Sequence, residues 1–187
     1  MEITRSLLLL SALPLFWSAP KQEPMAVRSE LTVEVDLSTR RMVVSADGRE
    51  LGAYDVTIGK PGHLTPTGTY KLSKVVWNPT WVPPDEEWAD TAHRKEAGEP
   101  GNPMGRVKIL FNSDLYIHGT TDKESLGDPA SHGCVRMSNA AAMRLARLVM
   151  EYGGASRGED WYASVRAKPT ESFEVAIPNP PVLRIKE

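Results

Sequence analysis

The sequence contains one thiol, Cys134, and two histidines lie near it along the chain. Cys134 belongs to the segment SHGCVRM, and His118 belongs to IHGT, sixteen residues earlier (134 − 118). A strand that ends at His118 and a loop that returns at Cys134 can bring the two side chains together. A thiolate attacks carbonyl carbon, and a neighbouring imidazole favours its formation. The pattern therefore predicts a cysteine-dependent acyl transfer.

The glycines beside these side chains fit the same chemistry. The backbone carbonyl near Gly119 can hold the tautomer of His118, as the third member of a catalytic triad does. Gly133 lets the backbone approach a substrate without a Cβ atom. We expect the N–H groups of Gly133 and Cys134 to form an oxyanion hole. A helix that begins near Ser138 would turn its positive end toward the thiol and favour the thiolate.

Three other interpretations account for part of the pattern. A single cysteine is often an inert buried thiol, although Gly133 before Cys134 and Arg136 after it indicate a polar setting. His118, His132 and Cys134 are possible zinc ligands, but the sequence has no Cys-x-x-Cys or His-x-x-x-His framework. His118 could also be an ordinary hydrogen-bonded histidine at a strand end. We predict no metal and no cofactor.

Composition and the first residues suggest an exported protein of one domain. The 187 residues carry a net charge of -2, which gives no basic footprint for nucleic acid, so no nucleic-acid partner is expected. Residues 1–20 combine Arg5 with an apolar run that is too short to span a membrane, and they predict a signal peptide or an uncleaved N-terminal anchor. Residues 21–30 are predicted to be a linker. We expect the protein in the periplasm or at the envelope face of the inner membrane, with membrane association if the anchor is retained.

The remaining residues predict a mainly β fold, a sandwich or barrel with one main helix after the cysteine. Period-two alternation and turn residues predict strands at 31–37, 41–45, 51–58, 69–76, 106–111, 115–118, 173–177 and 182–185. Residues 59–68 and 119–133 are predicted loops, and residues 77–103 a long excursion with a short helix after Pro84. Helix formers behind Ser138 or Asn139 as N-cap predict a helix at 138–151. Residues 155–171 are predicted to be a polar linker.

Several segments together resemble the L,D-transpeptidase (YkuD-type) catalytic domain. IHGT followed by SHGCVRM is similar to the catalytic signature of that family, and the TPTG within residues 58–72 is similar to another of its segments. NPTWVPP and GNPMG resemble its substrate-side loops, and the closing VAIPNPPVLRI resembles a C-terminal strand pair. The resemblance implies a YkuD-type fold, with a catalytic domain at residues 31–187.

The resemblance also implies roles for individual residues. Cys134 would be the nucleophile, His118 the general base and Gly119 the residue whose carbonyl orients it. Other positions would bind substrate: Ser131 and His132 along the site, Gly133 as oxyanion donor, Arg136 for a stem-peptide carboxylate, and Met104 with the Trp77 and Trp81 region as cleft wall. No role is assigned to His63 or His93.

The function that follows is acyl transfer on peptidoglycan stem peptides. Cys134 would attack the third residue of a tetrapeptide stem, release D-Ala and pass the acyl group to an amine. A second stem as acceptor gives a 3→3 cross-link, and a protein as acceptor is attached to the wall. Water as acceptor gives an L,D-carboxypeptidase or hydrolase instead, and a dead site would leave a peptidoglycan-binding module. The acceptor, the diamino acid and the oligomeric state are left open by the sequence.

Overall fold

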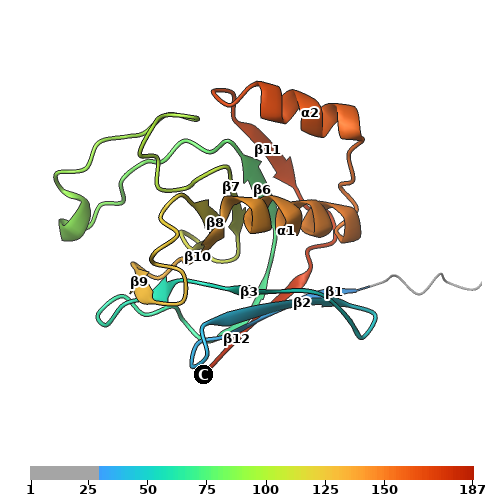
Figure 1. Ribbon diagram of the computed structural model, residues 1–187, viewed down its shortest axis with the longest axis horizontal. Coiled ribbons are helices and arrows are strands. Elements are labelled where there is room, and N and C mark those ends of the chain that lie inside the picture. Colours follow the sequence, from blue (N-terminus) through green and yellow to red (C-terminus); the bar gives the residue numbers. More distant parts are fainter. Residues whose placement is uncertain (1–29) are drawn as a thin grey trace, which may run out of the picture.

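Two five-stranded sheets, a small two-stranded sheet and two α-helices, one of them central, make up the described fold (Figure 1). This computed structural model describes residues 30–187. The expected signal or anchor at 1–20, and the linker up to residue 29, lie outside the described residues. The elements in chain order are β1 Leu31–Asp36, β2 Arg41–Ala46, β3 Arg49–Asp55, β4 Ile58–Gly59, β5 Gly68–Lys71, β6 Lys74–Trp77, the 3-10 helix η1 Glu87–Ala89, β7 Val107–Leu110, β8 Tyr116–Thr120, β9 Pro129–Ser131, β10 Val135–Ser138, α1 Asn139–Tyr152, α2 Glu159–Ala167, β11 Phe173–Ala176 and β12 Val182–Lys186.

Sheet one has the strand order β3-β2-β1-β12-β5. Strands β1, β2 and β3 form an antiparallel meander, and β12 pairs in parallel with β1, with Thr32 opposite Val182. Along β1 the residues alternate between buried and partly exposed, with Leu31, Val33 and Val35 in the core. This is the period-two pattern of a strand with one covered face.

Sheet two has the order β10-β8-β7-β6-β11 and carries the site described below. Its inner face contributes fully buried residues such as Ile109, Ile117 and Val135 to the core. Helix α1 packs on β7, β8 and β10 and also contacts β1, so it fills the space between the sheets. The Ser138 hydroxyl accepts a hydrogen bond from the Ala141 N–H at 3.2 Å and caps the helix, as expected.

Most predicted strands appear, and the mainly β class with a main helix after the cysteine is confirmed. The predicted strand at 69–76 is divided, because the chain crosses from sheet one to sheet two at Leu72 and Ser73. The Leu72 N–H donates to the Pro181 carbonyl on one side, and the Ser73 N–H donates to the Leu110 carbonyl on the other. Strand β9 lies within the predicted loop at 119–133, and β10 fills residues 135–138, for which no strand is predicted.

The prediction of a polar linker at 155–171 is wrong, because this segment contains helix α2. Its exposed side is polar, but Tyr162 and Val165 are buried. Their rings and methyl groups belong to the core, and the Tyr162 ring lies 5.6 Å from that of Trp77. Two buried apolar positions three residues apart make one helical face, a signal too short to stand out among the charged residues around it.

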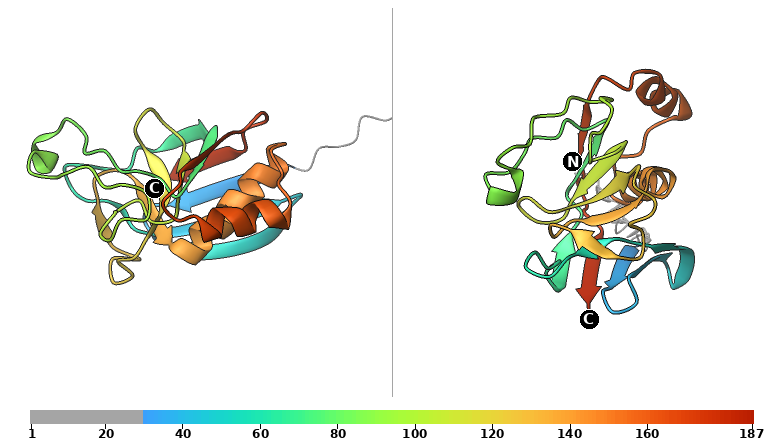
Figure 2. Two further views of the ribbon diagram at one scale, coloured as in Figure 1. Left: turned by 90° about the horizontal axis from the view of Figure 1, so that it is seen from above. Right: turned by 60° about the vertical axis from the view of Figure 1, so that its left-hand side comes forward.

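The excursion between β6 and β7 stands out to one side of the sheets (Figure 2). It contains the short helix η1 after Pro84, as predicted. Asn102 holds it together: its Nδ2 group donates to the Pro79 carbonyl at 2.8 Å and its Oδ1 atom accepts from the Met104 N–H at 2.9 Å. No helix within residues 30–187 is long and apolar enough to cross a membrane.

Candidate active site

The pairing of β8 with β10 places the histidine and the cysteine on one face of sheet two. These strands are parallel, with Ile117 opposite Val135 and His118 opposite Arg136. Cys134 precedes β10 by one residue, so its position continues the register opposite Tyr116. Because side chains alternate along a strand, Cys134 and His118 lie diagonally across two neighbouring strands, on the face turned away from the core.

The His118 ring is held by the residue that follows it. Its Nδ1 atom lies 2.9 Å from the Gly119 carbonyl oxygen. A carbonyl can only accept, so Nδ1 carries the proton and Nε2 is left as the basic atom. His118 is 2% exposed, and this burial lowers the pKa of its imidazole to about 4. The hydrogen bond to Gly119 acts in the opposite direction and raises the pKa, whereas the cations Arg136 and Lys108 lower it further. The resting imidazole is therefore neutral.

The Cys134 thiol is also neutral at rest. Burial raises the pKa of Cys134, and the backbone hydrogen bond from Tyr116 and the cations Arg136 and Lys108 offset only part of the increase. The expected thiolate at a helix N-terminus is not found. Four residues of β10 separate Cys134 from α1, about 13 Å at strand rise, and the helix dipole fades within a turn. The pair is thus a thiol beside a neutral base.

The loop before Cys134 is held from inside by Ser131. The Ser131 hydroxyl accepts from the Gly133 N–H at 3.1 Å and donates to the Cys134 carbonyl at 2.6 Å. Ser131 is fully buried, so the expectation that it lines the substrate site is not met. The Gly133 N–H is directed to the Ser131 hydroxyl in this structure. Gly133 also supplies a φ of +104°, a conformation that favours glycine.

The TPTG segment supports the cysteine loop from outside. The buried Thr65 hydroxyl accepts from the Gly59 N–H at 2.9 Å and donates to the Gly133 carbonyl at 3.0 Å. Nearby, Thr57 and Arg136 exchange two backbone hydrogen bonds of 2.9 Å. The loop and the strand on either side of Cys134 are therefore both fixed to residues 57–65.

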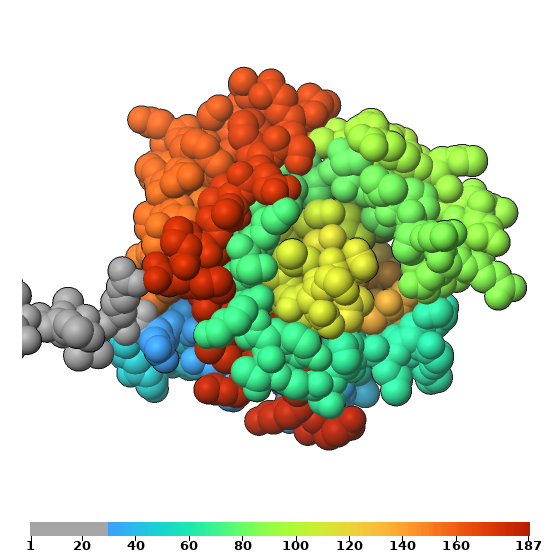
Figure 3. Space-filling model, turned by 180° about the vertical axis from the view of Figure 1, so that it is seen from behind, coloured from blue at the N-terminus to red at the C-terminus, as the bar shows by residue number. Residues whose placement is uncertain are grey.

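Cys134 opens into a cleft of about 480 Å³ beneath the excursion. Figure 3 shows this face, where green and blue-green loops border the yellow surface of the β7–β8 region. The lining residues are Thr80, Trp81, Val82, Pro83, Pro84, Glu86, Trp88, Pro103, Met104, Lys108, Asp114, Leu115, Tyr116, His118, His132, Cys134 and Arg136. The predicted His132, Arg136, Met104 and Trp81 are among them. Trp77 is not, because it is buried in β6 against α2.

An aromatic contact closes one end of the cleft. The Trp88 ring, on η1, stacks on the His132 ring with centroids 3.8 Å apart and planes at 8°. The His63 ring also contacts the His132 ring, in an edge-on arrangement with centroids 4.7 Å apart. The Trp88 Nε1–H donates to the Glu86 carboxylate at 2.6 Å. His63, to which no role was assigned from the sequence, thus contacts the cysteine loop at His132 and the excursion at Glu86.

Lys108 is a site residue that the motifs did not indicate. It lies opposite His118 across β7 and β8, just as Arg136 does across β10. A row of two cations with the histidine between them therefore crosses three strands. The Lys108 Nζ atom is 4.4 Å from the centre of the Tyr116 ring. The alternation of RVKILF places Lys108 on the face opposite Val107 and Ile109, which is the signal that could have identified it.

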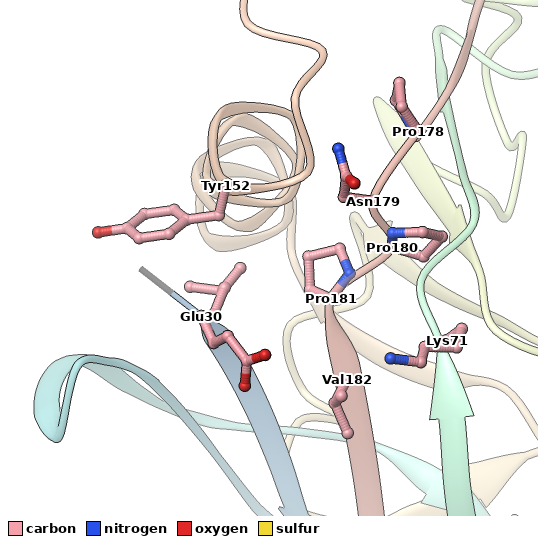
Figure 4. A pocket seen from close by; sticks show the side chains of 9 residues that line it. Glu30, Lys71, Tyr152, Pro178, Asn179, Pro180, Pro181 and Val182 are labelled. Atoms are coloured by element: carbon pink, nitrogen blue, oxygen red, sulfur yellow. The ribbon is translucent and has the colours of Figure 1, made fainter. Parts of the chain in front are cut away.

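A second pocket, of about 410 Å³, lies beside β1, β5 and the end of α1 (Figure 4). Three prolines and Tyr152 are among its lining residues, and its charged residues are Glu30 and Lys71. It holds no nucleophile and no histidine, so the chemistry belongs to the cleft. The zinc interpretation is not supported, since residues 30–187 contain no group of three or more His, Cys, Asp or Glu placed to hold a metal ion.

Comparison with known proteins points to one family. A family model described as the L,D-transpeptidase catalytic domain (YkuD) matches residues 30–168. YqjB from Bacillus subtilis, which carries a provisional L,D-transpeptidase name, is 32% identical over 123 residues, or 63% of this chain and 65% of that protein. YbiS from Escherichia coli, similarly named, is 34% identical over 94 residues, or 45% of this chain and 30% of that protein. The matches thus span less than two thirds of these relatives.

Solved structures share the fold. L,D-transpeptidase 3 from Mycobacterium tuberculosis superimposes with a TM-score of 0.55 at 19% identity, over 85% of this chain and 62% of that chain. A mutant of the Enterococcus faecium L,D-transpeptidase gives a TM-score of 0.54 at 15% identity, over 84% and 50%. At these identities the likeness supports the architecture alone.

Proposed function

Because this chain belongs to the L,D-transpeptidase catalytic-domain (YkuD) family, we propose that it transfers the acyl group of a peptidoglycan stem peptide to an amine. One observation carries the proposal. A buried neutral imidazole, with its Nδ1–H held by the Gly119 carbonyl, shares the cleft face of two paired strands with the only cysteine of the sequence. That arrangement is a nucleophile with its general base and its orienting acceptor.

The first half of the reaction forms a thioester. His118 Nε2 takes the proton of the Cys134 thiol as the sulfur attacks the carbonyl carbon of the third stem residue. The C–N bond to D-Ala then breaks. His118 returns the proton to the departing nitrogen, so D-Ala leaves with a free amino group. The Cys134 N–H faces the carbonyl oxygen of the intermediate as oxyanion donor, whereas the Tyr116 N–H donates to the sulfur.

The second half regenerates the thiol. An acceptor amine attacks the thioester carbon, His118 removes the amine proton, and the C–S bond breaks as the sulfur takes that proton back. The product is a new amide, a 3→3 cross-link when the amine belongs to a second stem. Water in place of the amine would give a free tripeptide. The neutral resting pair suits both halves, because one basic nitrogen must accept and return a proton in each.

Arg136 suits the carboxylate end of the stem. It lines the cleft next to Cys134, and its buried Nε atom has no hydrogen-bond partner among residues 30–187. A buried guanidinium nitrogen without a partner is unfavourable unless a ligand satisfies it. A carboxylate pairs with guanidinium in a bidentate manner, which supports Arg136 as the group that binds the terminal carboxylate of D-Ala.

The proposed substrate lies outside the inner membrane, so we further propose that the protein acts in the periplasm or at the envelope face of that membrane. The test of function uses purified protein and a disaccharide-tetrapeptide. Release of D-Ala with a cross-linked dimer is the expected result, and release of D-Ala with free tripeptide would identify a hydrolase. Intact-mass spectrometry after carbapenem treatment should show one adduct, absent from Cys134→Ala. An unmodified mass together with no D-Ala release would overturn the proposal.

A further inference from the structure

The side chain of Asn139, at the first position of α1, lies against two glycines beside the catalytic histidine. Its Oδ1 atom accepts a hydrogen bond from the Arg106 N–H at 2.8 Å, 33 residues earlier in the chain. A Cβ atom added to Gly119 would lie 2.2 Å from this Oδ1, and one added to Gly105 would lie 2.3 Å from it. Both distances are far below a van der Waals contact, so Asn139 occupies the space that these glycines leave.

Gly105 completes the enclosure of the Gly119 peptide. A Cβ at Gly105 would come within 2.6 Å of the Gly119 carbonyl oxygen. This oxygen is the one that accepts the His118 Nδ1–H. Gly119 is therefore enclosed on two sides: Gly105 lies next to its carbonyl oxygen, and the Asn139 carboxamide lies next to its Cα atom. Any movement of the turn at 105–106 therefore changes the packing around the Gly119 carbonyl oxygen.

The Asn139 side chain is not needed to cap its own helix. Ser138 performs that role with the Ala141 N–H, and Asn139 turns instead toward the end of the long excursion. Met104, which lines the cleft, directly precedes the turn that Asn139 holds. One carboxamide thus joins three parts of the molecule: the start of α1, the strand that carries the base, and the end of the excursion.

We propose that Asn139 is a positioning residue, which fixes the Gly105–Arg106 turn against the Gly119 peptide and so holds the His118 ring in its reactive orientation. The catalytic consequence rests on the function proposed above, whereas the positioning of His118 does not. Asn139 does not line the cleft, so it contacts neither the substrate nor the sulfur. Its influence passes through one hydrogen bond to Arg106 and one packing contact with Gly119.

The test follows the His118 Nδ1–H proton by NMR in the full chain, together with the rate of Cys134 acylation by a carbapenem. In wild type the proton should exchange slowly with solvent, because the bond to Gly119 is buried. Asn139→Ala should broaden or remove this signal and slow acylation by about 10-fold, since small misplacements of catalytic groups carry penalties of this order or larger. Asn139→Asp keeps an oxygen acceptor for the Arg106 N–H and should restore the signal and bring the rate within about twofold of wild type.

Ser138→Ala is the matched control, because it weakens the start of the same helix without touching Gly119 or Arg106. It should leave the His118 signal unchanged. Loss of the signal in both Ser138→Ala and Asn139→Ala, or its retention with a normal rate in Asn139→Ala, would overturn the proposal. If Asn139→Ala does not fold, Gly105→Ala should produce the same loss, and an unchanged His118 signal in that variant would overturn it. A wild-type protein that is not acylated but keeps a His118 signal dependent on Asn139 would refute the proposed function and leave the positioning role standing.

Discussion

Thr65 offers the sharpest test of how the cysteine loop is supported. Its hydroxyl connects the Gly59 N–H and the Gly133 carbonyl, and the residue is 4% exposed. Thr65→Val keeps the shape and removes both hydrogen bonds, which leaves one buried donor and one buried acceptor unsatisfied. At about 1–3 kcal/mol each, the free energy of unfolding should fall by roughly 2–6 kcal/mol. For a chain of this size the low end of that range corresponds to a decrease in melting temperature of at least about 4 °C.

The measurement is thermal unfolding followed by circular dichroism, with the alkylation rate of Cys134 as a second readout. The same substitution at Thr67, which is exposed, controls for the chemistry of the change, and Thr65→Ser should behave like wild type. We expect slower alkylation only in Thr65→Val, because Gly133 loses its external contact. Equal melting temperatures and equal alkylation rates for Thr65→Val and Thr67→Val would refute the reasoning that the TPTG segment holds the loop.

Three further predictions concern the site. Burial lowers the pKa of His118 from 6.5 to about 4, so the unfolded chain binds the proton before the folded chain does as pH falls. The free energy of unfolding should therefore decrease by roughly 3 kcal/mol between pH 6.5 and 4. Urea unfolding at several pH values should show a smaller decrease in His118→Gln than in wild type. Lys108→Met removes a cation that favours the thiolate, so the alkylation profile of Cys134 should move to higher pH; an unmoved profile would contradict this. Trp88→Ala removes the stack on His132 and should speed reaction of the thiol with bulky disulfide reagents at nearly unchanged melting temperature.

The sequence predicted the placement of His118 and Cys134 on one cleft better than it predicted their surroundings. His118 lies in β8 and Cys134 directly precedes the paired strand β10, so local motifs were enough to indicate that both line one cleft. The strands of sheet one were also readable, because residues such as Val33 and Val35 alternate with solvent-facing neighbours. The alternation of apolar and polar residues predicts a strand correctly where one face of that strand is buried and the other is exposed to water.

The errors arose where a residue's role depends on distant contacts. Ser131 looks like a site residue in SHGC, but the folded chain buries it fully, and the Gly133 carbonyl is held by Thr65, 68 residues earlier. The neutral state of Cys134 follows from burial that only the assembled sheets provide. The stack of Trp88 on His132 joins segments more than forty residues apart, and no spacing rule connects them.

The place of β12 in sheet one has a consequence for how the protein is made. This strand follows every other strand in the chain, yet it lies inside the sheet, between β1 and β5. Strand β5 reaches sheet one only through β12, and the segment just before β5 contains Thr65, which holds the cysteine loop. A chain that emerges from its N-terminus first therefore cannot complete this support until residues 182–186 arrive, since non-local pairing must wait for both partners. The order of synthesis thus delays the support of the Cys134 loop until the β12 segment has been delivered.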